Sequence, residues 1–316
     1  MGGYFKKAKF SIMRLPISTC VICTLGMCQL ASLPIQAKSV GDRYFPNYHP
    51  TPHTAKLPDW ELIENLKQKT GGWWPTKSVE KWRGNQLVSI TRGDPALMEI
   101  ALSFDDGPHP PFTQKLLALL KRMKVPATFF LVGWKVDEAP YIPRLMLKDG
   151  DVVANHTYHH FDLKLVPPEL AYNEISLGND AIRRACGITP RFFRPSGGQF
   201  DPAVINDAAE QHLTTVLWTT DPADYVSPGK GVIMHRILST VRPGSIILLH
   251  DGMQQTYDIL PTLVKILRSE GYRFVTIAQM ADHLIAQREA NEEQMDGNRS
   301  GSTLSLDHQD KIQHRY

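Results

Sequence analysis

Two neighbouring aspartates are the first candidates for chemistry in this sequence. Asp105 and Asp106 lie in ALSFDDGPHPP, residues 101–111, directly after a run of strand-like apolar residues. Adjacent carboxylates repel each other unless a cation or a proton donor lies between them, so the pair belongs either to a solvated turn or to a site. Asp-Gly-Pro taken alone is typical of a turn. The other polar residues of the chain must decide between these interpretations.

A pair of histidines with four-residue spacing offers ligands for a metal ion. His156 and His160 lie in NHTYHH, and a helical turn in this segment would direct both imidazoles to one side. One carboxylate would complete a set of three ligands and leave coordination positions open for water and substrate. A His-rich loop can also be merely solvated. His159, between the two, is expected to face elsewhere.

Seven short apolar or β-branched segments alternate with segments of helical period, a pattern typical of a parallel α/β fold. The expected strands cover residues 99–104, 127–132, 151–155, 191–194, 213–218, 245–250 and 272–277. The expected helices cover residues 113–123, 169–185, 202–211, 233–241, 256–270 and 278–288. This strand count favours an incomplete β/α barrel over a doubly wound sheet. No glycine-rich phosphate loop or dinucleotide motif follows any of these segments.

Polar side chains follow the expected strands on their carboxyl side. The set comprises Asp105, Asp106, His156, His160, Arg194, Asp221, Asp224 and His250. In a parallel barrel the carboxyl ends of the strands converge on one mouth, which is where barrel enzymes do their chemistry. Random placement would scatter polar residues over both ends of the strands. The shared placement therefore favours a site over a simple turn for the aspartate pair.

The same segments resemble the motifs of a known family. SFDDGP, HTYHH, FRPSGGQF, TTDPADY and IILLHD occur in the order of the five motifs of the polysaccharide deacetylases, the NodB-like carbohydrate esterases of family 4. The resemblance covers roughly residues 96–286. It implies an α/β fold, a distorted seven-stranded parallel (β/α) barrel. It also implies removal of acetyl groups from N-acetylated sugars, or less often from O-acetylated ones, with a divalent metal that is zinc or, alternatively, cobalt or nickel.

The resemblance assigns a metal-binding set and a catalytic base. Asp106, His156 and His160 would hold the metal, which polarises the acetyl oxygen and a water molecule. Asp105 would remain free of the metal and take a proton from that water. Arg194 would pair with Asp105, so that the carboxylate stays ionised and oriented.

A catalytic acid is implied on the other side of the substrate. His250 would donate a proton to the leaving amine, and Asp224 would keep His250 protonated for this role. Asp221 lies three residues earlier, and the choice of Asp224 depends on the aromatic residue that follows it. Leu248 would line the pocket for the acetyl methyl group.

Two segments depart from the family pattern. The third motif usually reads Arg-Pro-Pro-Tyr-Gly, whereas residues 194–198 read RPSGG. The backbone N–H at the tyrosine position serves as an oxyanion donor in the family, and it survives the change to Gly197, although the ring is lost. The fourth motif usually ends Asp-Trp, and Asp224 is followed here by Tyr225, which keeps a flat wall for the substrate. Both departures concern substrate preference more than chemistry.

The first 37 residues are expected to direct export. They carry four Lys or Arg residues and no acid, followed by an apolar stretch over residues 15–35 and a small residue at Ala37. A cleaved signal peptide is the preferred interpretation, and an N-terminal membrane anchor is the alternative. A lipoprotein site at Cys28 is disfavoured because the bulky Met27 precedes it. Either main interpretation places the protein outside the cytoplasm, secreted, periplasmic or associated with the cell envelope.

Charge and cysteine content agree with this division. Removing the four leader charges from the formal net charge of +3 leaves −1, which argues against nucleic acid as a partner. Only Cys186 lies beyond the leader, so no internal disulfide is expected. Residues 38–95 are expected to form an irregular N-terminal extension, residues 96–286 the catalytic domain, and residues 287–316 a polar, disordered tail.

The leading hypothesis is a metal-dependent amide hydrolase that acts on a polymer containing N-acetylglucosamine, such as peptidoglycan or chitin-like chains. One alternative is a carbohydrate-binding member of the same fold that lost turnover through its altered third motif. A second alternative is a glycosidase, which would need two carboxylates flanking the scissile bond. That mechanism gives the paired histidines no role. An amidase for a small cyclic or linear amide is a further alternative.

Overall fold

The structure, a computed structural model, describes residues 81–294. The expectations for the leader, for most of the N-terminal extension and for the end of the polar tail concern residues 1–80 and 295–316, which lie outside the described residues. Within residues 81–294, no helix combines the length and the apolar character that crossing a membrane requires.

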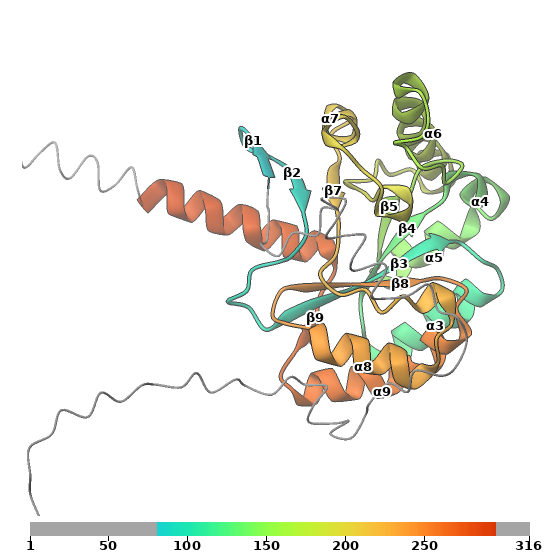
Figure 1. Cartoon of the computed structure of the whole chain (residues 1–316), viewed down its shortest axis with the longest axis vertical. Coiled ribbons are helices and arrows are strands. Elements are labelled where there is room, and N and C mark those ends of the chain that lie inside the picture. Colours follow the sequence, from blue (N-terminus) through green and yellow to red (C-terminus); the bar gives the residue numbers. More distant parts are fainter. Residues whose placement is uncertain (1–80, 295–316) are drawn as a thin grey trace, which may run out of the picture. The chain divides into compact units, whose positions relative to one another are not determined.

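A mostly parallel sheet forms the centre of the described chain (Figure 1). Its strands are β1 (Lys81–Arg83), β2 (Gln86–Ile90), β3 (Glu99–Gly107), β4 (Ala127–Leu131), β5 (Val152–Asn155), β6 (Phe192–Phe193), β7 (Thr214–Val216), β8 (Ser245–His250) and β9 (Arg273–Phe274). They follow the order β1-β2-β7-β6-β5-β4-β3-β8, with β9 also paired to β3, and only β1 and β2 pair antiparallel. Hydrogen bonds do not close this path into a full barrel. An isolated parallel bridge between Thr220 and Ile247 nevertheless brings the chain after β7 to β8.

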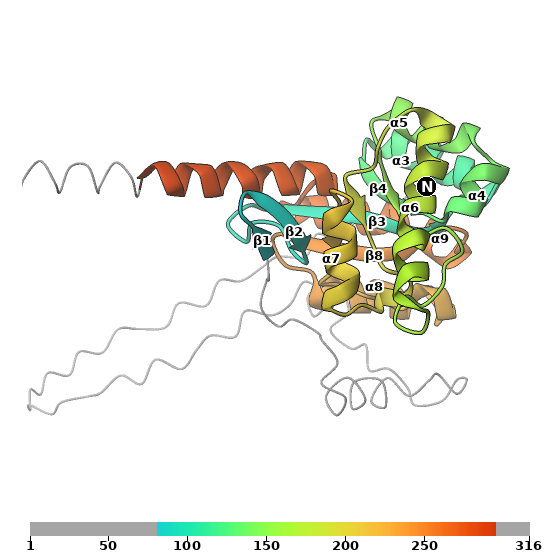
Figure 2. The same ribbon diagram turned by 90° about the horizontal axis from the view of Figure 1, so that it is seen from above.

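Helices cover the outer face of the sheet (Figures 1 and 2). They are α3 (Phe112–Met123), α4 (Gly133–Glu138), α5 (Tyr141–Asp149), α6 (Pro168–Cys186), α7 (Pro202–Glu210), α8 (Lys230–Thr240), α9 (Gln254–Ser269) and a last helix over residues 277–294, with short 3₁₀ turns η1 (Ser196–Gly198) and η2 (Asp224–Val226). Sequence signals set several of their ends. Asp201 caps α7 by accepting a hydrogen bond from the backbone N–H of Val204 at 3.0 Å, and Gly187 ends α6 with φ of 76°.

The alternation of side chains along β3 separates the core from the site. Ile100, Leu102 and Phe104 pack with apolar residues of the surrounding helices. Ala101 packs in a second cluster with residues of β4, β7 and β8. Because side chains alternate between the two faces of a strand, Ser103 and Asp105 share the inner face with Ala101. The strand therefore delivers a carboxylate to the inside of the barrel at its carboxyl end.

All seven expected strands are present, and the structure adds elements that the sequence did not predict. The hairpin of β1 and β2 lies in the segment expected to be irregular, and β2 pairs in parallel with β7. Its five-residue run QLVSI buries Leu87, Val88 and Ile90, but a run this short carries little periodicity. α4 and α5 were also missed, since Pro140 and Pro143 interrupt the helical pattern there.

The last helix extends further than expected, to residue 294. Residues 287–294 lie in the segment expected to be a disordered tail, yet they consist mainly of strong helix formers. Arg288 binds Glu292 at 2.7 Å, four residues on, and its guanidinium lies 4.3 Å from the ring centre of Trp82. The extra turns of the last helix therefore contact the β1–β2 hairpin through Arg288 and Trp82.

Candidate metal centre and active site

The side chains of Asp105 and Asp106 point in different directions at the end of β3. Asp105 is the last residue in register with β8, opposite His250. Asp106 then adopts a left-handed conformation with φ of 69°, where the pairing of β3 with β4 shifts register. Its backbone carbonyl accepts a hydrogen bond from Lys135 Nζ at 2.8 Å. Two neighbouring carboxylates thus reach different partners instead of facing each other.

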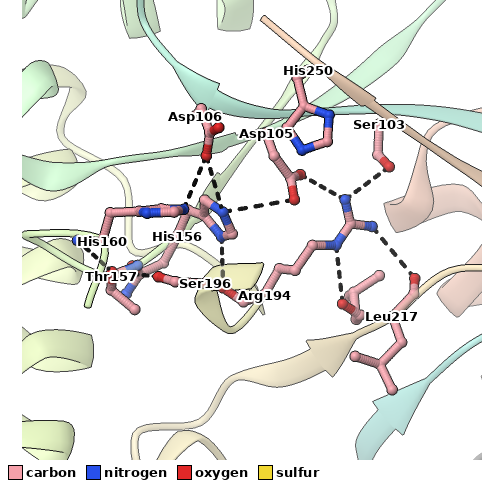
Figure 3. A network of polar contacts seen from close by, with 12 residues as sticks. Ser103, Asp105, Asp106, His156, Thr157, His160, Arg194, Ser196, Leu217 and His250 are labelled. Atoms are coloured by element: carbon pink, nitrogen blue, oxygen red, sulfur yellow. Dashed lines mark hydrogen bonds and ion pairs between the residues drawn. The ribbon is translucent and has the colours of Figure 1, made fainter. Parts of the chain in front are cut away.

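Asp106 lies against both histidines of the HTYHH motif (Figure 3). Its Oδ1 is 3.0 Å from His160 Nε2 and 3.4 Å from His156 Nε2. One ligand atom from each of the three residues lies within 4.8 Å of the others. Two imidazoles and one carboxylate are a donor set that suits zinc and similar divalent ions. The arrangement is a candidate metal site.

The histidines do not meet through a helical turn, which was the condition attached to their four-residue spacing. β5 ends at Asn155, whose side-chain oxygen accepts a hydrogen bond from the backbone N–H of Thr157 at 2.8 Å. The chain then turns through left-handed conformations at Thr157 and His160, with φ of 66° and 67°. The backbone N–H of His160 donates to Thr157 Oγ1 at 3.0 Å. This tight loop still brings the two imidazoles of the motif together, with the centres of the His156 and His160 rings 4.9 Å apart.

Neighbouring groups orient the candidate ligands. His156 Nδ1 lies 2.8 Å from the backbone carbonyl of Arg194 and donates to it, which directs Nε2 toward Asp106. Burial alone would raise the pKa of Asp106. Hydrogen bonds from His156 and His160, together with the charge of His156, outweigh burial and hold that pKa below its ordinary value. Asp106 is therefore ionised, as a metal ligand must be.

A buried ion pair fixes Asp105. Arg194 is fully buried, and its Nη1 donates to Asp105 Oδ1 at 2.6 Å and to Ser103 Oγ at 2.9 Å. The guanidinium also lies 4.0 Å from the ring centre of Phe130. Burial lowers the pKa of Arg194, and the charge of Asp105 opposes that effect. The other oxygen, Asp105 Oδ2, is 3.7 Å from His156 Nε2, which places it beside the candidate metal site.

His250 forms an ion pair with Asp224 at the end of β8. Its Nδ1 lies 2.7 Å from Asp224 Oδ1, and its backbone N–H donates to Oδ2 at 2.9 Å. Burial lowers the pKa of His250, but the hydrogen bond and charge of Asp224, with smaller contributions from Asp105 and Asp106, raise it overall to about 9. The histidine is thus protonated at neutral pH, with Nε2 as its remaining donor. Geometry distinguishes the two aspartates of the motif, since a carboxyl oxygen of Asp221 accepts from the backbone N–H two residues later.

The three residues expected to contact substrate lie in different settings. Gly197 is exposed in η1 with φ of 60°, a conformation that glycine adopts without strain. Tyr225 is half-exposed, and its ring lies edge-on to His250 with centres 5.2 Å apart. Leu248 is buried on β8, opposite Ser103. Contact of these residues with a substrate stays a prediction.

Several residues that support the site carry no sequence signal of their own. Thr256 of α9 donates to Asp224 Oδ2 at 2.6 Å, and the buried Glu174 of α6 accepts from the backbone and ring of His159. Lys135 of α4 reaches the carbonyl of Asp106. Ser103 alone was within reach of sequence reasoning, because it precedes Asp105 by two on the same strand face.

Comparison with known proteins gives independent evidence for the family of this chain. A family model described as polysaccharide deacetylase matches residues 93–216. A peptidoglycan-N-acetylglucosamine deacetylase of Bacillus cereus is 37% identical over 186 residues, covering 57% of this chain and 87% of the relative. A chitooligosaccharide deacetylase of Sinorhizobium fredii is 35% identical over 207 residues, covering 61% and 96%. A solved family 4 carbohydrate esterase pseudoenzyme of Bacillus anthracis matches with a TM-score of 0.59 at 25% identity, covering 71% and 82%.

These matches extend along most of each relative. The chain therefore belongs to the polysaccharide deacetylase family, whose enzymes are hydrolases acting on carbon–nitrogen bonds other than peptide bonds. The resemblance seen in the five motifs is confirmed. The expected fold is confirmed as well, as a distorted parallel β/α barrel whose sheet remains open in its hydrogen bonding.

Proposed function

We propose that this protein removes acetyl groups from N-acetylated sugars of a polysaccharide and uses a divalent metal to do so. Zinc is the preferred candidate for that metal. The observation that carries this proposal is the gathering of three different functions at one mouth. A candidate metal site, a carboxylate paired with a buried guanidinium and a protonated histidine come from strand ends that are distant in the sequence. Metal-assisted hydrolysis of an amide can use all three.

The residues present fit the metal that the family implies. Asp106, His156 and His160 would hold it, and the hydrogen bond from His156 Nδ1 to a carbonyl orients one imidazole for that role. When bound, the metal would polarise the acetyl oxygen and increase the acidity of a water molecule. Zinc suits two nitrogen ligands and one oxygen ligand, and cobalt and nickel accept the same set.

The side chains divide the proton transfers between them. Asp105, held in place by its ion pair with Arg194, takes a proton from the water whose oxygen attacks the acetyl carbon. His250, kept protonated by Asp224, gives its proton to the sugar nitrogen as the carbon–nitrogen bond breaks. Acetate and a free amine result. The backbone N–H of Gly197 would donate to the oxygen that gains negative charge during attack.

The proposed substrate is a polymer of N-acetylglucosamine type outside the cytoplasm, either peptidoglycan or a chitin-like chain. The named activities of the B. cereus and S. fredii relatives support this choice of sugar. Export through residues 1–37, as a signal peptide or a membrane anchor, would bring residues 96–286 to such a substrate. An O-acetyl esterase of the xylan type remains the alternative within the same chemistry.

The strongest rival is a member that binds carbohydrate without turnover. The B. anthracis protein is a pseudoenzyme of carbohydrate esterase family 4, so the fold also occurs in a protein without turnover. In this chain, the loss of turnover would result from the altered third motif, in which Gly197 replaces the family tyrosine. Against it stand the ion pair of Asp105 with Arg194 and the pairing of His250 with Asp224, which binding alone does not require.

Acetate release tests the proposal. Purified protein would be assayed on peptidoglycan, chitooligosaccharides and acetylated xylan, before and after chelation and after addition of zinc or cobalt. We expect release from an N-acetylated substrate that stops on chelation and returns with metal. Oligosaccharide binding without acetate release from any substrate would favour the rival, and release that survives complete removal of metal would contradict the mechanism.

A further inference from the structure

We propose that Phe161 is a stacking platform for the sugar residue next to the one that is deacetylated, an inference that rests on the proposed function. Phe161 directly follows the candidate metal ligand His160. Its side chain is 42% exposed although it is large and apolar. None of the roles assigned above involves this ring, and the family motifs quoted above stop one residue before it.

The ring is held rigidly from one side. Phe161 stacks on the imidazole of His159, with centres 5.1 Å apart and planes 19° apart. His159 is fixed in turn by Glu174, a fully buried residue of α6, which accepts from its ring at 2.6 Å and from its backbone N–H at 2.7 Å. An exposed aromatic ring with a fixed underside binds a ligand at little cost in conformational entropy.

The loop that carries Phe161 is joined to the loop that carries Gly197. Lys164 Nζ donates to Gln199 Oε1 at 3.0 Å, and Thr157 Oγ1 lies 3.0 Å from Ser196 Oγ. These contacts place both loops on the same edge of the mouth. Gly197 leaves that edge without the ring that the family usually supplies there. Phe161 offers an aromatic face on the adjoining loop.

A second exposed ring lies on the other side of the site. Tyr225 contacts His250, at the end of β8, whereas Phe161 follows the loop after β5. Because β3 and β4 lie between β8 and β5 in the sheet, the two rings belong to segments on opposite sides of the end of β3. Such an arrangement suits an extended polymer that crosses the mouth, more than a single sugar.

The chemistry of a β-linked N-acetylhexosamine chain fits this ring. Its pyranose rings present C–H groups as apolar faces, which pack on aromatic side chains while the hydroxyl groups stay in water. A single exposed apolar side chain would need no explanation by itself. The fixed underside, the place beside a metal ligand and the loss of the family ring on the adjoining loop together point to a carbohydrate contact.

Kinetics on substrates of increasing length tests the inference. Phe161→Ala is expected to raise KM for the tetramer of N-acetylglucosamine by about 2- to 10-fold, the loss of one aromatic contact, with a smaller effect on the monosaccharide. Phe161→Trp should restore the tetramer KM. Leu177→Ala on α6 is the matched control, since Leu177 is apolar, 41% exposed and on the outer side of that helix. Zinc affinity is measured for every variant.

Calorimetric binding of the same tetramer separates this inference from the proposed function. If the wild type binds the tetramer more tightly than Phe161→Ala but releases no acetate, the proposed function fails and the platform stands. Equal tetramer affinity and equal KM in the two proteins overturn the platform, as does the absence of any binding. A loss of zinc affinity that accounts for the whole effect would also overturn it, because Phe161 would then only support the metal loop.

Discussion

Replacing Asp224 by Asn should remove the catalytic acid without removing the histidine that carries it. Asp224 is fully buried, and it contacts both the ring and the backbone N–H of His250. Asn has nearly the same shape but no charge. Burial, which lowers the pKa of His250, remains in the variant, whereas the main cause that raises it is lost. The pKa should therefore fall from about 9 to its ordinary value of 6.5 or below.

The size of the effect follows from these two pKa values. At pH 7.5 a histidine with a pKa of about 9 is about 97% protonated, whereas one with a pKa of 6.5 is about 9% protonated. The rate at this pH should accordingly fall by about tenfold or more. The difference of about 2.5 units corresponds to about 3 kcal/mol of interaction between His250⁺ and its surroundings.

The pH dependence of kcat/KM is the assay. The wild type should lose activity above a pH of about 9, as His250 loses its proton, and Asp224→Asn should lose activity above about 6.5. Asp221→Asn is the control, since that carboxylate accepts from the backbone N–H of Ala223 instead. An unchanged alkaline transition in Asp224→Asn would refute the role of the pair.

The same pKa shift contributes to stability. A group whose pKa is raised on folding stabilises the folded state fully below its unfolded pKa, so the contribution of His250 is complete below about pH 6.5. It is lost as the pH rises through about 9. The stability difference between wild type and Asp224→Asn should narrow over that interval.

Two further predictions concern the support of the site. Arg194→Met should leave Asp105 as an unpaired buried group, destabilise the protein by about 3–5 kcal/mol in denaturant unfolding and abolish activity. Arg191→Met is the control: it breaks an exposed pair with Asp282 and a contact over the Phe192 ring, and it should cost under about 1 kcal/mol. Equal losses would contradict the buried role of Arg194. Gly198→Ala would place its Cβ 2.4 Å from Trp218 Cη2 at a φ of 66°, so it should cost about 1–3 kcal/mol more than Gly187→Ala, which has a similar φ and open space. Similar melting temperatures for the two variants would show that the ring moves aside.

Sequence reasoning succeeded where a repeating pattern met a simple geometric rule. The β/α alternation predicted seven of the nine strands in residues 81–294, and the convergence of parallel strand ends predicted that Asp105, Asp106, His156 and His250 would share one mouth. Alternation along β3 was also enough to place Ser103 beside the base, although that step was not taken.

Other features depend on contacts that no local pattern encodes. The four-residue spacing of His156 and His160 indicated a helical turn, but the side chain of Asn155 competes for the backbone and forces a tight loop. Asp221 and Asp224 lie in one loop; the family resemblance favoured Asp224 through the aromatic residue that follows it, and the position of β8 is what brings that carboxylate to His250. Glu174 reaches His159 from a helix that begins after the metal loop, so its partner follows from tertiary packing alone.

The proposed mechanism depends above all on a metal held by Asp106, His156 and His160. A crystal structure of the zinc-loaded protein, with anomalous scattering recorded at the zinc edge, tests it most directly. We expect a single strong peak within about 2.0–2.2 Å of one oxygen of Asp106 and Nε2 of both histidines, next to Asp105. A peak at other residues, or none at this mouth in protein that releases acetate, would contradict it.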